Sequence, residues 1–371
     1  MTSHTDSPTF KVKENAEIEV KNKYTQLNTE GYGGMLCATW LDRPLSIAGR
    51  VLVSEGNSIV TKLLNIDRDL LMIPNVAIHM NRAANDGFKY NLQVDMLPLL
   101  SGGDDRQKDF KQIIADELGV KKEDILGHDL YLYNRMAPSI WGANEEFISA
   151  GHLDDLQCGF ASLKALLAGY NDESIDIMAC FDNEEVGSGT KQGADSTLLR
   201  DTLIRINNAL GKTEEDYHRA LASSFMLSAD NAHAVHPNHP EHTDVTNCTY
   251  MNEGVVVKSH AGQKYTSDGV SMAVVKSLAS GADVPLQYFA NRSDKAGGST
   301  LGNIAMAQAS MNAVDIGLPQ LAMHSSYETA GIKDTYYAIA LMKALFDSHI
   351  QETSTPVSYT HLRAHETELH L

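Results

Sequence analysis

Cysteine is scarce in this chain of 371 residues, and its four cysteines are isolated from one another. Neither the density of a disulfide-stabilised domain nor the paired spacing of a zinc ribbon is present. The sequence also lacks an apolar run approaching the roughly 18 residues of a membrane-spanning helix, and its opening residues, MTSHTDSPTF, lack the apolar stretch of a signal peptide. We therefore expect a cytoplasmic protein.

Basic residues are also fewer than acidic residues. The chain has 30 basic and 48 acidic residues, and a formal net charge of -18. This is the wrong sign for coating a phosphate backbone or an anionic lipid surface, so we expect no nucleic-acid partner and no membrane partner. In contrast, 43% of the residues are apolar, which is ample for a buried core, and the length favours one large domain with a smaller one.

The pattern of apolar residues changes along the chain. Residues 20–91 contain short β-branched and aromatic runs between turn residues, which predict short antiparallel strands. From about residue 125, compact apolar runs alternate with helical patterns such as LDDLQCGFASLKALLAGY. This alternation predicts an α/β fold with a mainly parallel sheet flanked by helices. Residues 355–371 lack apolar periodicity, and we expect them to be a non-native tail.

Five segments place acids or histidines where an α/β sheet presents ligands, at strand ends and in the loops that follow. They are SHTDSP, AGHLDDLQ, FDNEEVGSGT, LSADNAHAVHP and LAMHSS. Each signal is weak alone, since a single histidine after a strand is more often structural. Together the segments offer two nitrogens and three carboxylates, a set that suits two divalent cations bridged by a carboxylate and a water: His4, Asp154, Glu185, Asp230 and His324.

The segment FDNEEVG holds a pair of consecutive glutamates, Glu184 and Glu185, after the apolar run IDIMACF. Adjacent side chains on an extended backbone point in opposite directions. One glutamate can therefore bind a metal while the other reaches a metal-bound water. Two cations roughly 3.5–4 Å apart would lower the pKa of a shared water, so that hydroxide becomes available near neutral pH.

These segments and their order along the chain resemble the M18 metallopeptidase family, the aspartyl aminopeptidases. The resemblance extends from Ser3 to about His349. The resemblance implies a zinc-peptidase-like catalytic domain formed by residues 1–15 and 146–350, with an inserted smaller β-rich domain at 16–145 that forms a dimer contact. It also implies a homo-oligomer in which dimers assemble into a dodecamer. Relative to the family, a helix and a strand before the HTDSP motif are missing, so we expect His4 to be weakly held.

The resemblance also assigns roles to the ligand set. His4, Asp154 and Asp230 would hold one metal ion, while Asp154, Glu185 and His324 would hold the other. Ligation that is rich in carboxylates and lacks cysteine suits two zinc ions, with cobalt or manganese as alternatives.

By the same resemblance, Glu184 would be the general base that takes a proton from water and delivers it to the departing amine. Asp6 would orient the His4 ring. Because the α-amine of a peptide would sit close to one metal, such a site removes residues from the amino terminus of peptide substrates.

The resemblance further implies a preference for an acidic first residue, whose carboxylate needs a cation or several donors. Lys258 and His233 match substrate-binding positions of the family, and His79 resembles a histidine that a neighbouring subunit contributes. Ser299 could place its hydroxyl at a helix start near the substrate. On sequence alone, Lys258 could equally be a surface lysine, and Ser299 could equally belong to an ordinary helix cap.

A further tract, HAVHPNHPEH, has histidines at every third position. Pro237 and Pro240 prevent a continuous helix there, so the spacing does not create one face. We therefore expect His236, His239 and His242 to be loop residues.

Two other functions remain open. One is a broad or glutamyl aminopeptidase of the related M42 group, which would share the dinuclear centre but differ in its substrate pocket. The other is a catalytically silent oligomeric shell protein. The complete ligand set with Glu184 argues against the silent protein, because a non-enzyme has no need for a base next to water.

Overall fold

The structure is a computed structural model that describes residues 1–103 and 109–350. The described chain divides into two compact units. The large unit contains Met1–Ser7, Ser139–Met323 and the chain from Glu328 onward, and the small unit contains Pro8–Pro138 and His324–Tyr327. Among the described residues, no helix is both long and apolar enough to cross a membrane. The tail expected at 355–371 lies outside the described residues.

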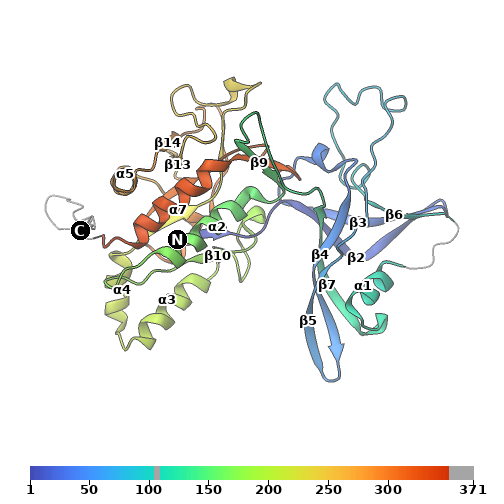
Figure 1. Ribbon diagram of the computed structural model, residues 1–371. Helices are drawn as coiled ribbons and strands as arrows, with labels where there is room; N and C mark the ends of the chain where they lie inside the picture. Colours follow the sequence, from blue (N-terminus) through green and yellow to red (C-terminus); the bar gives the residue numbers. More distant parts are fainter. Residues whose placement is uncertain (104–108, 351–371) are drawn as a thin grey trace, which may run out of the picture. The chain divides into compact units, whose positions relative to one another are not determined.

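The large unit is built on a mixed sheet whose strands are mostly parallel (Figure 1). Only the pairing of β13 with β15 is antiparallel within this sheet of the described chain. In spatial order its strands are β10 (Ala179–Phe181), β1 (Thr2–His4), β11 (Phe225–Ala229), β15 (Asn312–Gly317), β13 (Val255–Lys258) and β14 (Leu286–Phe289). The expected mainly parallel sheet is confirmed.

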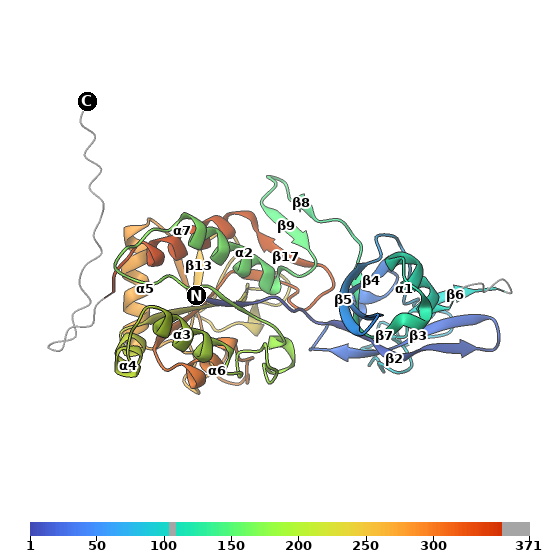
Figure 2. The ribbon, with the colours of Figure 1, turned by 90° about the horizontal axis from the view of Figure 1, so that it is seen from below.

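Helices cover both faces of this sheet, as Figure 2 shows. Successive residues of β11 serve opposite faces, because side chains alternate along a strand: Leu227 packs with one helical layer and Met226 with the other. The first layer holds α2 (Leu153–Ala168), α5 (Gly269–Gly281) and α7 (Ile332–Phe346), and the second holds α3 (Leu198–Ala209) and α6 (Leu301–Gln308). The helix α4 (Glu214–Ala222) follows α3. This layering confirms the predicted α/β class.

The large unit also contains a second, five-stranded sheet. Its order is β12 (Ala232–His233), β16 (Pro319–Leu321), β17 (Glu328–Gly331), β9 (Phe147–Ala150) and β8 (Ser139–Trp141). Strand β12 begins three residues after β11 ends, so one chain segment links the two sheets.

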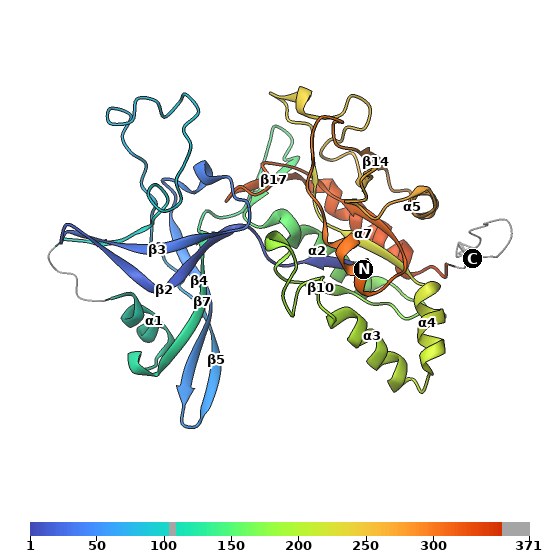
Figure 3. The same ribbon diagram turned by 180° about the vertical axis from the view of Figure 1, so that it is seen from behind.

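The small unit is an antiparallel sheet (Figure 3). It has its own apolar core. Its order is β5 (Ser58–Asn65), β4 (Leu45–Glu55), β7 (Ile125–Asn134), β2 (Thr9–Val20), β3 (Tyr24–Tyr32) and β6 (Leu99–Gly102). Helix α1 (Phe110–Leu118) packs its buried residues into the same core. Strand β7 lies at the point where we placed the start of the α/β pattern, yet it pairs with β4 and β2 in this antiparallel sheet.

Candidate active site

The strand order of the main sheet brings three functional segments to one edge. Strands β10, β1 and β11 are parallel neighbours, so the segments after their carboxyl ends meet at the same edge. His4 ends β1 and pairs with Phe181 at the end of β10. Glu184 and Glu185 follow β10 in a single 3-10 turn, and Asp230 directly follows β11. Residues far apart in the sequence therefore converge.

His4 is held more firmly than the sequence suggested. Its strand β1 lies between β10 and β11, and the residue is only 1% exposed. The backbone N–H of His4 also donates to Asp155 Oδ2 at 3.1 Å. The expectation of a weakly held His4 is wrong, because residues 2–4 themselves form an interior strand of the sheet.

The His4 ring faces two buried carboxylates. His4 Nε2 lies 3.6 Å from Asp154 Oδ1 and 3.9 Å from Asp230 Oδ1. One ligand atom from each of the three residues lies within 4.8 Å of the others. Asp154 reaches this position because the first turn of α2 is non-helical there, with φ −84° and ψ 110°. A buried imidazole with two carboxylates is a donor set that zinc accepts.

Asp6 connects this cluster to the glutamate pair. Its carbonyl oxygen lies 3.0 Å from His4 Nδ1, and its carboxylate accepts hydrogen bonds from the backbone N–H groups of Glu184 and Glu185, both at 3.1 Å. Because a carbonyl oxygen only accepts, Nδ1 of His4 carries a proton and Nε2 is the nitrogen suited to a cation. The resemblance implied that the Asp6 carboxylate orients the ring, whereas the hydrogen bond comes from the carbonyl oxygen and the carboxylate lies 3.4 Å from Nδ1. The bonds to the glutamate turn were not expected.

The charges of the cluster shift the ionisation of its members. Burial lowers the pKa of His4, but the nearby carboxylates of Asp154, Asp230 and Asp6 together outweigh it and raise that pKa well above its usual value. Burial raises the pKa of Glu184 to about 7, and the negative charge of Asp230 adds to the effect. The neighbouring carboxylates contribute to both shifts, and a bound cation would offset their negative charge. The residues present therefore fit a metal site.

The comparisons with known proteins agree with this reading. A family model described as aminopeptidase I zinc metalloprotease (M18) matches residues 1–346. The chain belongs to the M18 family. It is 50% identical over 339 residues to a probable M18 family aminopeptidase 2 of Clostridium acetobutylicum, which covers 90% of this chain and 78% of the relative. The predicted family and enzyme class are confirmed: the protein is a metal-dependent aminopeptidase.

Solved structures of the M18 family show the same fold. The structure of the Ape4 and Nbr1 complex matches with a TM-score of 0.88 and 34% sequence identity, over 93% of this chain and 70% of that chain. The S. cerevisiae mApe1 dodecamer matches with a TM-score of 0.77 and 28% identity, over 93% of this chain and 78% of that chain.

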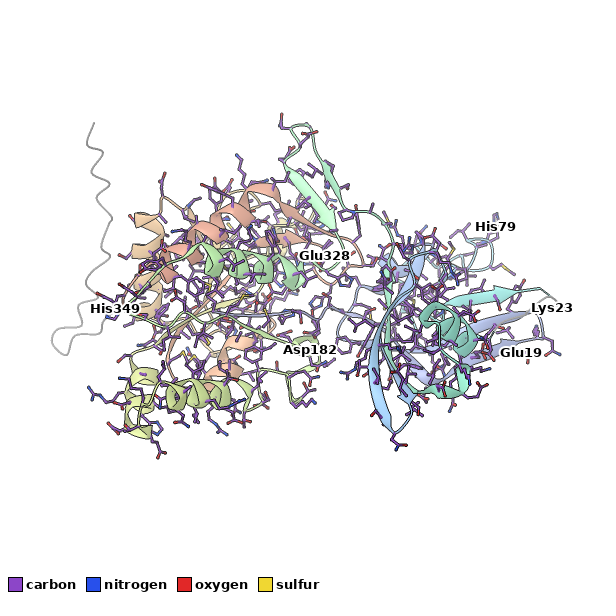
Figure 4. The ribbon with its side chains drawn as sticks, turned by 60° about the horizontal axis from the view of Figure 1, so that its bottom comes forward. Glu19, Lys23, His79, Asp182, Glu328 and His349 are labelled. Carbon is purple, nitrogen blue, oxygen red and sulfur yellow. The ribbon has the colours of Figure 1, made fainter. Side chains whose placement is uncertain are left out.

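Two predicted residues of the M18 site belong to the small unit. His324 follows Met323 of the large unit directly, and its Nδ1 lies 2.9 Å from the carbonyl oxygen of Gly34. As with His4, this contact puts the proton on Nδ1 and the lone pair on Nε2. His79 is exposed in the turns that follow β5, where Figure 4 labels it.

Lys258 is buried at the end of β13, and its ammonium group interacts with other groups of the protein. Its Nζ donates to the carbonyl oxygen of Asn231 at 2.9 Å and lies 3.7 Å from Asp230 Oδ2. Burial lowers the pKa of Lys258, but Asp230 together with the neighbouring Tyr265 and Asp315 outweighs this and leaves that pKa above its usual value. An acidic substrate side chain would have to compete with Asp230 for this ammonium group.

The other two predicted substrate residues are exposed. His233 ends the short strand β12, and its ring lies 5.9 Å from that of Phe289. Ser299 Oγ lies 3.4 Å from the Lys264 carbonyl oxygen, just before α6. Thr300, the capping residue that precedes α6, makes no capping bond with its side chain, because its hydroxyl donates to buried Asp315 at 2.8 Å.

Sequence reasoning missed two buried polar residues near Asp154 and Asp230. Glu328, labelled in Figure 4, is 2% exposed, and its Oε2 accepts the backbone N–H of Asp154 at 3.0 Å. Asn231 donates to Gln157 Oε1 at 3.1 Å and to Gln320 Oε1 at 2.9 Å. Asn231 could have been noticed beside Asp230, but Glu328 lies in no motif that we recognised.

Replacing Lys258 with Met tests the structural role of its ammonium group. We expect the metal-depleted protein to lose about 3–5 kcal/mol of unfolding free energy, because Asp230 would lose its buried cationic neighbour. Lys276→Met is the matched control: this exposed lysine of α5 lies 5.0 Å from the Tyr288 ring centroid, a contact worth roughly 0.5–1 kcal/mol. Equal losses in denaturant unfolding would contradict the role.

Proposed function

We propose that this M18 aminopeptidase removes acidic amino-terminal residues from peptides with two divalent metal ions and Glu184 as the general base. The observation that carries the proposal is the buried cluster of His4, Asp154 and Asp230 beside Glu184. These three ligands would hold one ion. Asp154 would be shared with a second ion, which Glu185 would also bind.

His324 would complete the second set of ligands. It is an imidazole joined directly to the large unit through Met323, and its Nδ1 contact with Gly34 directs the lone pair to Nε2, the state that a metal ligand requires. The family description names zinc, and imidazole with carboxylate oxygens suits zinc, whereas cobalt and manganese are the alternatives.

Different residues of the chain would have different roles in the hydrolysis. The bound ions would lower the pKa of a water and polarise the scissile carbonyl. Glu184, with a pKa of about 7, is suited both to accept the water's proton and to deliver it to the departing amine. Asp6 positions Glu184 through the backbone N–H, and it holds the His4 ring at the same time. His233 would contact the substrate backbone or the developing oxyanion.

The variant Glu184→Gln tests the role of Glu184 as the general base independently of metal binding. We expect a loss of about 10²–10⁴ in kcat, because glutamine cannot accept the proton, with the metal content unchanged. Glu185→Gln is the matched comparison, since it removes the adjacent carboxylate and should lower the metal content. Rate measurements combined with metal analysis check both. A Glu184→Gln protein with the normal rate would contradict the assignment of the base.

The acidic preference rests on the resemblance to the aspartyl aminopeptidases and on Lys258, the lysine beside Asp230. We expect kcat/KM for Asp and Glu anilides to exceed the values for Leu and Lys anilides, since an acidic side chain would compete with Asp230 for the Lys258 ammonium group. Ser299 would add a hydroxyl donor near the substrate. Faster hydrolysis of the Leu or Lys anilide would instead support the broad aminopeptidase.

We also propose a cytoplasmic homo-oligomer. The four free cysteines favour a reducing compartment, and the matched S. cerevisiae mApe1 is a dodecamer. His79 would reach the active site of a neighbouring subunit. We expect sedimentation analysis to detect an assembly of dimers, up to the dodecamer, and His79→Ala to lower kcat/KM without changing the assembly. A monomer that is fully active would contradict both statements.

A further inference from the structure

The loop between β12 and β13 carries a histidine cluster that the proposed active site does not use. Within it, Pro240–His242 forms a single 3-10 turn that His239 precedes as the capping residue. Side chains three residues apart eclipse one another in a 3-10 helix. The rings of His239 and His242 are accordingly close, with centroids 5.3 Å apart. Pro240, which we expected only to interrupt a helix, here begins the turn.

Glu241 lies against both rings. Its Oε1 is 3.0 Å from His239 Nδ1 and 3.6 Å from His242 Nε2. One ligand atom of each residue lies within 4.8 Å of the others. Bonds of about 2.0–2.1 Å in a tetrahedral zinc site place neighbouring ligand atoms roughly 3.3 Å apart. The two observed distances lie on either side of that value, so small side-chain rotations would admit an ion.

The backbone that carries these side chains is anchored. The Arg292 guanidinium donates to the carbonyl oxygen of Glu241, and the same guanidinium pairs with both carboxylate oxygens of Asp294 at 2.9 Å. The N–H of His242 donates to the His239 carbonyl oxygen at 3.1 Å. A turn that is fixed before binding loses less conformational freedom when a ligand arrives.

We propose that His239, Glu241 and His242 form an additional binding site for a divalent cation of the zinc type. The three side chains are 60%, 59% and 67% exposed, so water would complete the coordination. Two imidazole ligands favour zinc, copper or nickel over magnesium or calcium. The site shares no residue with the His4 cluster and does not depend on the proposed mechanism.

Metal analysis after equilibrium dialysis against Zn²⁺ tests the site on the full chain. We expect the unmodified protein to bind one more Zn²⁺ per chain than the double variant His239→Ala, His242→Ala over a range of free Zn²⁺ concentrations. Dialysis against Mg²⁺ should give no difference. His218→Ala is the matched control, because His218 is an exposed histidine with a single glutamate at 3.9 Å, and its zinc content should equal that of the unmodified protein.

Glu241→Gln provides a second variant that keeps the turn and its size. We expect it to weaken the additional Zn²⁺ without loss of aminopeptidase activity, which would show that the active-site metal is retained. Equal zinc contents in the unmodified protein, the double variant and Glu241→Gln would overturn the proposal. An equal loss of zinc in His218→Ala would also overturn it, since the ion would then be bound by surface histidines in general.

Discussion

The candidate active site depends on a concentration of buried negative charge around one imidazole. Asp154 and Asp230 lie within 4 Å of His4 Nε2, and Asp6 lies on the other side of the ring. Carboxylates so close together in a buried place repel one another, and their separation from water adds to the cost. A positive charge must therefore be present. Without a metal ion a protonated His4 would supply it, and at the proposed metal site a bound cation would take over this role.

The main sheet makes this arrangement possible. The parallel strands β10, β1 and β11 place the glutamate pair, His4 and Asp230 together at their carboxyl ends. No single segment of the chain carries all of these residues. Around them, backbone N–H groups rather than further side-chain charges hold the acids in place: Asp6 accepts two of them, and Glu328 accepts that of Asp154. Lys258 adds one positive charge next to Asp230. Backbone hydrogen bonds thus hold these acids around a centre whose excess negative charge a metal ion would offset.

The two histidine groups of the large unit contrast in their environment. His4 is buried among carboxylates at a sheet edge, whereas His239 and His242 are exposed on a turn with a single glutamate. A buried site excludes water and strengthens electrostatic interactions, so it can support chemistry. An exposed site leaves water among its ligands, and we infer that it binds an ion without catalysis.

The sequence by itself determined the α/β class, the family and the residue types of the candidate site. Those features depend on local periodicity and on short motifs such as DNEEVG, which the chain carries wherever it folds. Only the tertiary structure decided that residues 2–4 form an interior strand, that Asp6 binds the glutamate turn and that Lys258 is directed at Asp230 and Asn231. Strand register and side-chain packing set these contacts between distant parts of the chain, and neither can be read from neighbouring residues.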